Sequence, residues 1–410
     1  MHMKLKDICE QVTDKISSEK ISIEDYVTTD CILQNKAGRT IAANLPPKKC
    51  KLIHYKKGDI LIANIRPYLR KIWFADCEGG CSADVLTFRV KNNHTPEFLY
   101  AILMQDSFYD YVMKATKGSK MPRGDINHIM NFPIVSDNLN ETRIGKFITS
   151  IDKKIAINQQ INRNLEELAK QIYDYWFLQF DFPNEDGKPY KSSGGKMVWN
   201  EILKRDIPAG WNCFEMQNIC NISRGASPRP IEAYMDTTNT GIPWIKISDA
   251  TEDIESPYLL KIKDCIIPEG KEKSVSVKPD TLIVSNSATP GIPKFVELNA
   301  CVHDGWLILD KYDSYYKYYL FYVIKMVRYN LLYLASGSIF KNLKTDYLKT
   351  LPTLVPDIKI LQRFDEKIER IMKHILKTER EINELIELRD NLLPLIMNGQ
   401  VTLNSCLSAD

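Results

Sequence analysis

The chain has 410 residues, a formal net charge of +3, and a composition that is 44% hydrophobic and 26% charged. This length predicts two or three domains, and the composition is ordinary for a folded globular protein. No apolar run approaches the roughly eighteen residues of a membrane helix, and the first residues, MHMKLKDICE, lack the apolar core of a signal peptide. We therefore expect a cytoplasmic protein that binds nucleic acid, if at all, through local basic patches.

The ten cysteines and six histidines are scattered along the chain. Cys77 and Cys81 are close in sequence, as are Cys213 and Cys220. Neither pair joins a second pair or a histidine at the spacing of metal ligands. We expect reduced thiols and no metal site.

Residues 1–140 are expected to form the first domain, an α+β fold with a mixed, largely antiparallel β-sheet. Three runs of β-branched and aromatic residues bounded by Gly, Pro and Asp predict strands: Ile60–Ala63, Lys71–Ala75 and Val85–Val90. One helix is predicted from Pro96 to Met113, with Phe98, Ile102 and Tyr109 on a common stripe.

Residues 141–182 are expected to form a long helix. Its seam positions alternate in spacing between three and four residues, as in a heptad repeat: Ile148, Ile151, Ile155, Asn158, Asn162, Leu165, Ala169, Ile172 and Trp176. The two asparagines on this seam predict a buried polar contact that lowers stability but fixes the register of a helix pair.

A linker is expected over residues 183–200, because Asp181 to Gly195 is rich in Pro, Gly, Ser and charge. Residues 201–355 then predict a second domain of the same class. Its expected strands are Pro243–Ile247, Thr281–Val284, Lys294–Glu297 and Trp306–Leu309, followed by a helix from about Tyr315 to Leu334.

A second long helix is expected over residues 356–400, before a tail at 401–410. Pro356 precedes it and Asn398-Gly399 closes it. Its seam positions are Leu361, Phe364, Ile368, Ile371, Ile375, Thr378, Ile382, Leu385, Arg389, Leu392 and Ile396. About forty residues at about 1.5 Å each give a length of about 60 Å, so this helix is expected to lie along the first one. The alternative is that each helix packs only on its own domain.

The chain is internally duplicated at an offset near 220 residues. Gly58–Asn64 resembles Pro279–Ser285, and Cys81-Ser-Ala-Asp84 resembles Cys301-Val-His-Asp304. Gly118-Ser119 also matches Gly337-Ser338, and Pro133 matches Pro352. Such a repeat predicts two domain-plus-helix copies related by a pseudo-two-fold axis, with antiparallel helices and a domain at each end of the helix pair.

Motifs of common enzyme classes are missing from the sequence. Neither Gly-x-Gly-x-x-Gly nor Gly-x-x-x-x-Gly-Lys-Ser/Thr occurs. Asn44-Leu-Pro-Pro47 is broken as a methyltransferase motif by Leu45 and by Lys48, which stands where an aromatic residue is needed. Pro279-Asp280 lacks the second carboxylate and the lysine of a nuclease strand. We therefore expect a chain with no catalytic residues and no cofactor of its own.

Three basic or polar loops recur at matched places in both copies. Arg, Asn, Ser and Thr suit hydrogen bonds to base edges, while Lys and backbone amides suit phosphates. An ordinary solvated surface is the alternative for any single loop, and the recurrence favours DNA binding. The candidate DNA-binding residues are Arg66, Tyr68, Arg70, Lys71, Lys117, Ser119, Lys120, Arg123, Arg224, Ser227, Arg229, Asn286, Ser287, Thr289, Ser338, Lys341, Asn342 and Lys344.

The whole chain resembles the specificity (S) subunit of type I restriction-modification systems. The resemblance is carried by Leu385–Val401, by Ile222–Pro228, and by the two Gly-Ser loops. It implies a non-catalytic subunit in which each target-recognition domain reads one half of a two-part DNA site.

The same resemblance implies that the helices set the gap between the half-sites and dock methyltransferase (M) subunits, which bring S-adenosylmethionine. Restriction (R) subunits would complete the nuclease. The expected helix-pairing and docking residues are Ile151, Ile155, Asn158, Asn162, Leu165, Ile172, Ile368, Ile371, Ile375, Ile382, Leu385 and Leu392. The alternatives are a coiled-coil scaffold with two protein-binding domains and a self-sufficient modification enzyme. The missing glycine loop argues against the enzyme.

Overall fold

The computed structural model describes residues 3–91, 93–118, 120–134, 140–238, 240–251, 253–334 and 343–403. The chain divides into two compact units. Unit 1 comprises Met1–Asn158 with Glu381–Asp410, and unit 2 comprises Gln159–Arg380. Each unit thus contains one globular domain and a part of each long helix.

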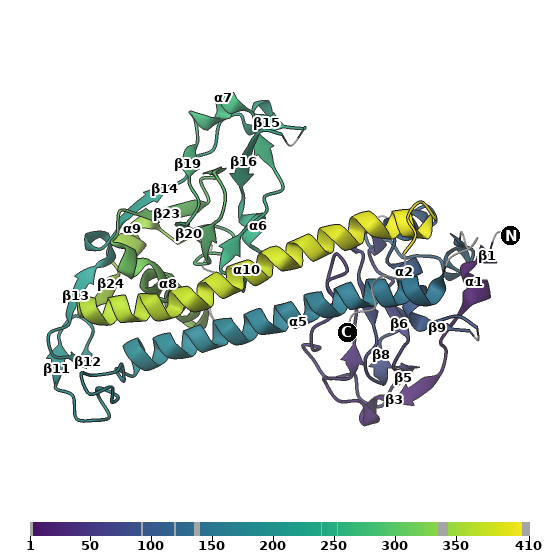
Figure 1. Cartoon of the computed structure of the whole chain (residues 1–410), viewed down its shortest axis with the longest axis horizontal. Coiled ribbons are helices and arrows are strands. Elements are labelled where there is room, and N and C mark those ends of the chain that lie inside the picture. The colour runs from purple at the N-terminus through teal and green to yellow at the C-terminus, as the bar shows by residue number, and fades with distance from the viewer. Residues whose placement is uncertain are drawn as a thin grey trace. The chain divides into compact units, whose positions relative to one another are not determined.

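Unit 1 is built on two four-stranded sheets (Figure 1). The first has the order β2 (Cys9–Gln11), β9 (Val85–Val90), β6 (Ile60–Ala63), β7 (Ile72–Phe74), and all its neighbours are antiparallel. The second has the order β3 (Lys15–Ser17), β5 (Lys51–Tyr55), β8 (Gly79–Cys81), β4 (Tyr26–Val27), with β4 parallel to β8. Strands β1 (Met3–Lys4) and β10 (Pro133–Ile134) form a separate antiparallel pair.

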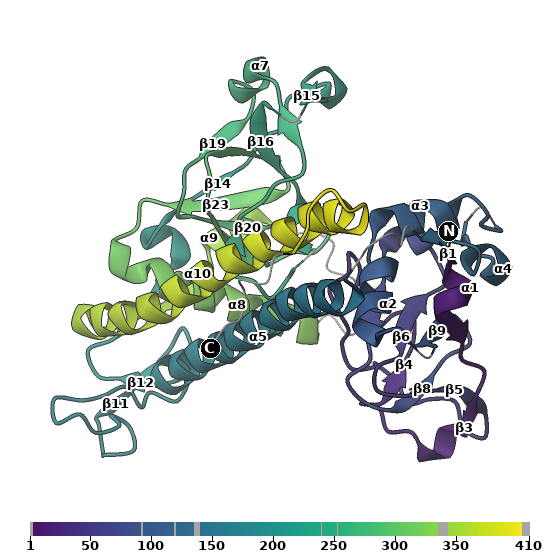
Figure 2. The same cartoon turned by 45° about the vertical axis from the view of Figure 1, so that its right-hand side comes forward.

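The helices of unit 1 cover the first sheet. They are α1 (Leu5–Ile8), α2 (Pro96–Leu103), α3 (Asp106–Met113) and α4 (Ile126–Ile129). Helix α2 lies against β6 and β9 (Figure 2). The apolar stripe expected here is buried, since Phe98, Ile102 and Tyr109 are at most 2% exposed. The single helix expected from Pro96 to Met113 is corrected to two, because Gln105, which precedes α3, has an extended backbone.

Unit 2 repeats this plan with five-stranded sheets. The first has the order β14 (Asn221–Arg224), β23 (Trp306–Asp310), β20 (Thr281–Ser285), β21 (Pro293–Val296), β17 (Tyr258–Leu259), with only β17 and β21 parallel. The second has the order β15 (Met235–Asp236), β18 (Cys265–Ile266), β16 (Ile242–Ile245), β22 (Ala300–Val302), β19 (Val275–Val277), with only β16 and β22 parallel.

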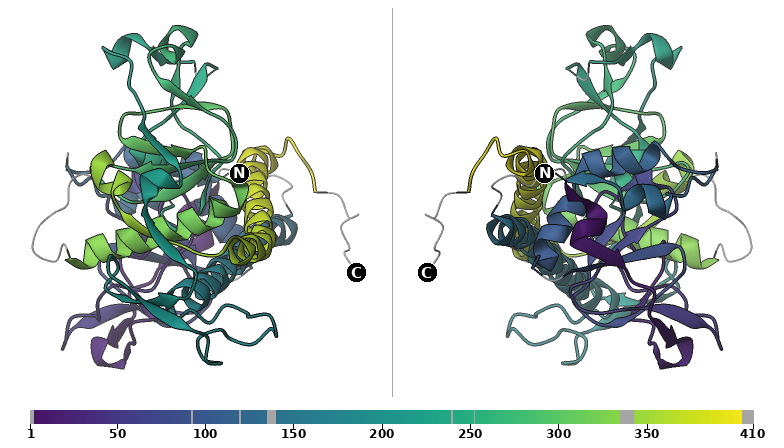
Figure 3. Two further views of the ribbon diagram at one scale, coloured as in Figure 1. Left: turned by 90° about the vertical axis from the view of Figure 1, so that its left-hand side faces the viewer. Right: turned by 90° about the vertical axis from the view of Figure 1, so that its right-hand side faces the viewer.

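The remaining elements of unit 2 surround these sheets. Strands β11 (Met197–Asn200) and β12 (Arg205–Pro208) form a hairpin, and β13 (Asn212–Glu215) pairs with β24 (Pro352–Val355). The helices are α6 (Ile247–Thr251), α7 (Pro268–Lys271), α8 (Lys317–Leu334) and α9 (Thr345–Lys349). Helix α8, light green in Figure 3, lies against β20 and β21.

The duplication seen in the sequence is present in the strand order. In unit 1, β2-β9-β6-β7 has the same sequence order and antiparallel directions as β14-β23-β20-β21 in unit 2. In the second sheets, β5-β8-β4 matches β19-β22-β16, including the one parallel pair. The α+β class with largely antiparallel sheets is confirmed.

Both long helices form as predicted. Helix α5 runs from Glu141 to Tyr173 and continues into a π-helical turn, η3 (Asp174–Leu178), while α10 runs from Ile358 to Met397. In unit 1, Asp152 contacts Arg389 and Lys154 contacts Glu381, so these parts of the helices are antiparallel. In unit 2, the early α10 residue Phe364 meets Trp176 and Phe177, which gives the same direction.

The buried seam of α10 in unit 2 does more than pair with α5. Leu361, Phe364, Ile368 and Ile375 belong to the same core as the sheet and α8 of the second domain. The ring of Phe364 also lies 6.4 Å from that of Tyr322 on α8. Pairing along another helix and packing on its own domain, stated above as alternatives, are therefore both present here.

The segment expected as an exposed linker is a folded loop. Asp181 is buried and accepts hydrogen bonds from the backbone amide and hydroxyl of Ser192. The ring of Phe182 stacks between those of Tyr190 and Trp211. Residues 185–188 and 191–194 of this segment are exposed, as expected, but polar composition does not show whether the few aromatic residues of a loop pack in a core.

The described cysteines, which exclude Cys406, are all free thiols. Within the described parts of the chain, no helix is long and apolar enough to cross a membrane, and no group of three or more metal-ligating side chains is found.

Candidate nucleic-acid interface

The first basic cluster of unit 1 follows strand β6. The chain leaves Ala63 and forms a short 3-10 turn, η2 (Pro67–Leu69), flanked by Arg66 and Arg70 in the left-handed conformation. The side chains of Arg66 and Tyr68 are exposed. This part of the predicted site is therefore free to meet a ligand.

Arg70 and Lys71 are instead tied to their own domain. Arg70 Nη1 lies 3.0 Å from the Asp106 carboxylate at the start of α3. Lys71 Nζ donates a 2.6 Å hydrogen bond to the carbonyl of Thr29. Lys71 is only part-exposed, so we reassign it from DNA binding to anchoring the loop that contains Thr29.

The glycine-bearing loop of unit 1 folds onto this cluster. Lys117 and Arg123 exchange two backbone hydrogen bonds, and the Arg66 amide donates to the Pro122 carbonyl. The Gly124 amide donates to Asn64 Oδ1 at 3.1 Å. The structure thereby brings together two predicted segments that are more than fifty residues apart in sequence.

Arg123 is held by a carboxylate in the turn between β8 and β9. Its Nη2 lies 3.0 Å from Asp84 Oδ1, and both side chains are about half exposed. The Asp84 carbonyl accepts the Asn64 amide at 2.8 Å. Arg123 is therefore oriented from the sheet while it remains open to solvent.

The outer basic residues of this loop behave differently from one another. Lys117 pairs with Asp125, and this hydrogen bond is the main cause that lowers the pKa of the Asp125 carboxyl. Asp125 also caps α4 through the amides of Asn127 and His128. Lys120 is exposed, and Ser119 lies outside the described residues.

In unit 2 the corresponding turn, between β22 and β23, carries Asp304. Arg224 Nε donates to the Asp304 carbonyl at 2.7 Å. The Ser227 hydroxyl donates to Asp304 Oδ1 at 2.9 Å. Arg229 Nη2 lies 3.7 Å from Asp304 Oδ2, and its side chain is 83% exposed. Three predicted residues therefore converge on one aspartate.

The chain after β14 passes so close to this turn that only glycine fits at position 225. A Cβ at this position would lie 2.3 Å from the His303 carbonyl oxygen. The Gly225 amide donates to the Trp306 carbonyl, and the Ala226 amide donates to that of Val302. These contacts place Arg224 and Ser227 on either side of the Asp304 turn.

His303 completes the cluster. Its Nε2 lies 3.1 Å from Asp304 Oδ1, and its Nδ1 accepts the Gly305 amide at 2.8 Å. Partial burial lowers the pKa of His303. A neutral ring that accepts at Nδ1 carries its proton on Nε2, toward the carboxylate.

The polar loop after β20 does not present Asn286 to a ligand. This side chain is buried, and its backbone amide and carbonyl bond to Gly305 and Leu343. Its Nδ2 points to the Asp304 carbonyl at 3.5 Å. We reassign Asn286 as a structural residue, while Ser287 and Thr289 are half-buried.

The last predicted loop is only partly described. Lys344 is exposed and precedes α9. Ser338, Lys341 and Asn342 lie outside the described residues.

The predicted docking residues lie mainly between the helices. Ile151, Ile155, Asn158, Asn162, Ile368 and Ile375 are buried, and Leu165, Ile172, Ile371, Ile382, Leu385 and Leu392 are half-buried. Asn158 Nδ2 donates to Glu381 Oε2 at 2.9 Å, so one seam amide has a partner. Burial closes six of these twelve side chains to a partner protein, and we assign those six to packing of the helices.

A different face of the helices is open. In unit 2, Ile161, Leu168 and Tyr175 are exposed and spaced seven residues apart on α5 and η3. A groove of about 520 Å³ beside them is lined by Leu168, Gln171, Ile172, Asp174, Tyr175, Trp176, Gln179 and Lys367. In unit 1, Ile157, Leu388 and Leu395 are likewise exposed.

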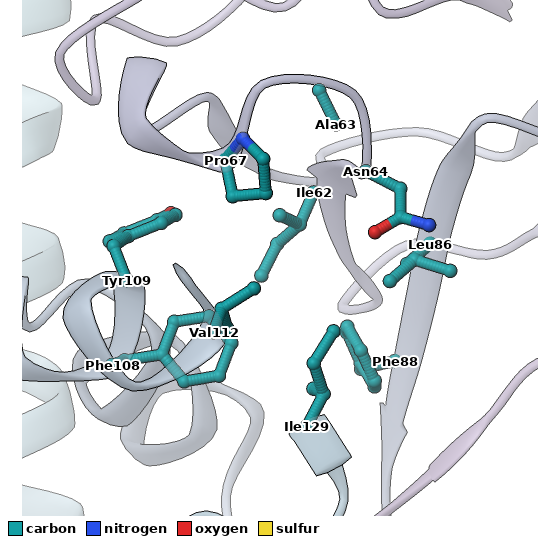
Figure 4. Close-up of a pocket in the computed structure, with 10 residues that line it drawn as sticks. All are labelled: Ile62, Ala63, Asn64, Pro67, Leu86, Phe88, Phe108, Tyr109, Val112 and Ile129. Atoms are coloured by element: carbon teal, nitrogen blue, oxygen red, sulfur yellow. The ribbon is translucent and has the colours of Figure 1, made fainter. Parts of the chain in front are cut away.

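Unit 1 also contains a small enclosed cavity beside β6 and α3 (Figure 4). Ile62, Leu86, Phe88, Phe108 and Tyr109 are among its lining residues, and its volume is about 10 Å³. That volume holds no more than about one water molecule. The cavity is therefore part of the core and not a ligand site.

Sequence reasoning did not assign Asp84, Asp304 or His303 to the site. The signal was present, since Cys81-Ser-Ala-Asp84 and Cys301-Val-His-Asp304 occupy matched places in the repeat. Their negative charge does not mark Asp84 and Asp304 as part of a surface that is expected to bind a polyanion.

Comparison with known proteins gives concordant matches over nearly the whole chain. The family model described as "Type I restriction modification DNA specificity domain" matches residues 1–167 and 208–388. The MjaIX specificity subunit of Methanocaldococcus jannaschii is 22% identical, covering 97% of this chain and 92% of the relative. The HindI specificity subunit of Haemophilus influenzae is 21% identical, covering 97% and 98%.

A similar solved structure is the type I restriction-modification system S subunit from M. genitalium. Its TM-score is 0.58 at 14% identity, and the match covers 97% of this chain and 95% of that one. This likeness supports the fold, with its two domains and long helices.

Proposed function

The chain belongs to the type I restriction modification DNA specificity family, and we propose that its two target-recognition domains each read one half of a two-part DNA site. The observation that carries this proposal is the repeated turn. In both domains an aspartate at the end of the second sheet holds solvent-exposed arginines, Arg123 in one and Arg224 and Arg229 in the other. An arginine whose guanidinium faces solvent can donate two hydrogen bonds to the O6 and N7 atoms of guanine in the major groove.

The remaining candidate residues divide between the two half-sites. Arg66, Tyr68, Lys117, Lys120 and Arg123 would serve the first half. Arg224, Ser227, Arg229 and Lys344 would serve the second, together with Ser338, Lys341 and Asn342. In this assignment arginines read bases, and the lysines neutralise phosphates.

The exposed apolar face of the helices supports docking of methyltransferase subunits. An exposed aromatic side chain beside a groove, such as Tyr175, is typical of the centre of a protein interface. The catalytic work and S-adenosylmethionine would reside in those partner subunits, with restriction subunits joining them. This chain would then be a non-catalytic subunit that works in the cytoplasm, where the DNA is. A stand-alone scaffold is not favoured by the family match.

Base-resolution mapping of methylated adenine in the source cell, with and without this gene, tests the proposal. We expect one two-part motif with a fixed gap to lose methylation when the gene is deleted, and to regain it when the gene is restored. The control is the same deletion complemented with a chain truncated before α10. An unchanged map in a cell that expresses an active partner methyltransferase would contradict the proposal.

A further inference from the structure

The equivalent three-residue turns of the duplicated fold, 82–84 in unit 1 and 303–305 in unit 2, each carry an aspartate, Asp84 as the third residue and Asp304 as the second. Each turn joins the last strand of the second sheet to the next strand of the first sheet, β8 to β9 in unit 1 and β22 to β23 in unit 2. In each unit the residue that follows the adjacent strand of the first sheet donates its backbone amide to a carbonyl of this turn. Asn64, after β6, donates to the Asp84 carbonyl, and Asn286, after β20, donates to the Gly305 carbonyl. The two turns therefore share one backbone frame, and their aspartates stand at neighbouring positions of it.

Each carboxylate also has the same kind of partner, although the partners come from different parts of the chain. Arg123, which approaches Asp84, lies C-terminal to that turn, at the end of the glycine-bearing loop. Arg224 and Arg229, which approach Asp304, lie N-terminal to it, at and beyond the end of β14. Two unrelated loops thus bring arginine to the aspartate of the same turn.

A carboxylate in a DNA-facing cluster weakens phosphate binding, because it repels the backbone. Its recurrence beside the exposed arginines therefore indicates another role. An exposed arginine such as Arg229, free on one side, has many rotamers, and fixing its guanidinium lowers the entropy cost of a directed contact. A carboxylate can also accept a hydrogen bond from cytosine N4.

Resting on the proposed function, we propose that Asp84 and Asp304 are positioning residues that set target specificity: each orients its arginines toward base edges and disfavours binding through phosphates alone. Specificity, and not affinity, is then the quantity that they control. In unit 2, Ser227 and His303 hold the Asp304 carboxylate in turn, through contacts of 2.9 and 3.1 Å to Oδ1.

The test uses the assembled specificity–methyltransferase complex with Asp84→Asn or Asp304→Asn. Equilibrium binding is measured on four duplexes: the intact target, one with the first half scrambled, one with the second half scrambled, and one with both halves scrambled. For Asp304→Asn we expect discrimination at the second half to fall about tenfold, the effect of about one mismatched base pair. Discrimination at the first half stays at the wild-type ratio, and affinity for fully scrambled DNA is unchanged or higher. Asp84→Asn should give the mirror result.

Two controls separate this role from a structural one. Asp110→Asn and Glu232→Gln remove an exposed carboxylate from α3 and from the second domain. In both variants, the ratio of affinities for intact and half-scrambled DNA should remain at the wild-type value for each half-site. A double-mutant cycle of Asp304→Asn with Arg224→Gln should give non-additive effects on the second-half ratio. The cycle stays informative even if one variant is less stable, because its readout is the ratio between duplexes.

The outcomes are distinct. Provided that the wild-type complex discriminates, three results would overturn this inference. They are an unchanged ratio of affinities for intact and half-scrambled DNA in both aspartate variants, an equal loss of affinity on all duplexes, and additive effects in the double-mutant cycle. A wild-type complex that binds all duplexes equally would instead overturn the proposed function. Asp304→Glu, which keeps the charge, is expected to restore part of the second-half discrimination.

Discussion

At the scale of single residues, the candidate interface is defined by which polar side chains are left free. Lys71 and Asn286 are held by backbone groups of their own domains. Arg66 and Lys120 are exposed, while Arg123 and Arg229 are exposed and oriented by a carboxylate. The distinction matters because a side chain already bonded inside the fold has to lose that bond before it can contact DNA.

Replacing Arg123 by Ala is expected to weaken recognition of the first half-site only. Loss of one base-reading arginine costs about 1–3 kcal/mol of discrimination at the position that it reads. The measurement is binding of the assembled complex to duplexes with either half scrambled. Arg163→Ala, an exposed arginine on α5, is the charge-matched control. Equal weakening on both halves would show that Arg123 contacts only phosphate or supports the fold.

At the scale of elements, polar residues on the helix seam have matched partners. Arg389 is 2% exposed, and its Nη1 lies 2.7 Å from Asp152 Oδ1. Its Nε also lies 3.0 Å from the neighbouring Asp390. A buried pair of this kind adds little stability compared with apolar side chains, but it fixes which residues of the two helices face each other.

Arg389→Leu is therefore expected to destabilise unit 1 strongly, since it leaves the Asp152 carboxylate buried without its cation. Breaking a buried pair in this way costs about 3–5 kcal/mol. Urea unfolding of the full chain, followed by circular dichroism, measures the change. The double variant Asp152→Leu/Arg389→Leu should recover most of the loss. A double variant no more stable than Arg389→Leu would contradict this account.

A second group of buried charges joins the helices to the domain within unit 2. Burial raises the pKa of Glu379 on α10 to about 8 and that of Glu166 on α5 to about 7. Glu379 accepts a hydrogen bond from the Ser256 hydroxyl, and Lys325 lies 3.6 Å from Glu166. Lys294, whose pKa burial lowers to about 8, donates to the carbonyls of Asp253 and Ser256.

These shifts predict that unit 2 loses stability as the pH rises. A carboxyl whose pKa is raised on folding stabilises the fold fully below its unfolded pKa near 4.5, and that contribution is lost as the pH rises through the folded value. Thermal unfolding between pH 5 and 8 should show a falling midpoint, with the steepest fall around pH 6, between the unfolded value and the two folded values. Lys294 acts in the opposite sense as the pH approaches and passes 8.

Glu379→Gln is the variant that checks the assignment. The amide keeps the shape and the hydrogen-bonding capacity but cannot ionise, so the midpoint should rise at pH 8 and the pH profile should flatten. Glu366→Gln, on an exposed face of the same helix, should leave the profile unchanged. A steep profile that persists in Glu379→Gln would assign the loss to other groups.

At the scale of the whole molecule, two similar domains with different loops predict two independent readers on one chain. The chain alone has a net charge of only +3, so strong DNA binding is expected to need the phosphate contacts of partner subunits. The two parts of the function, reading and modification, would thus lie on different chains.

The salt dependence of binding tests this division. For the assembled complex, the logarithm of affinity for random DNA should fall linearly with the logarithm of salt concentration, with a slope of about 0.9 per neutralised phosphate. The isolated chain should bind more weakly and with a shallower slope. Electrophoretic titration at several salt concentrations, with and without the methyltransferase subunit, measures both. Equal slopes would mean that this chain makes all the phosphate contacts itself.

The sequence by itself determined the duplication, the two long helices, most core strands and the family resemblance. These features follow from periodicity and local composition, which neighbouring residues specify: the seam positions from Leu361 to Ile396 and the strands at Ile60 and Thr281 needed no distant contact to be predicted. The break at Gln105 was missed because an apolar stripe continues across it.

Only the tertiary structure decided which loop residues form a site. Arg224 and Asp304 are 80 positions apart and meet because β14 and β23 pair in one register. Lys71 and Asn286 look like surface residues in the sequence but are held by backbone carbonyls or buried in the fold. Polar composition predicts that a residue lies in a loop, while the pairing of distant strands determines what that loop contacts. The cluster around each turn aspartate is therefore a property of the folded chain.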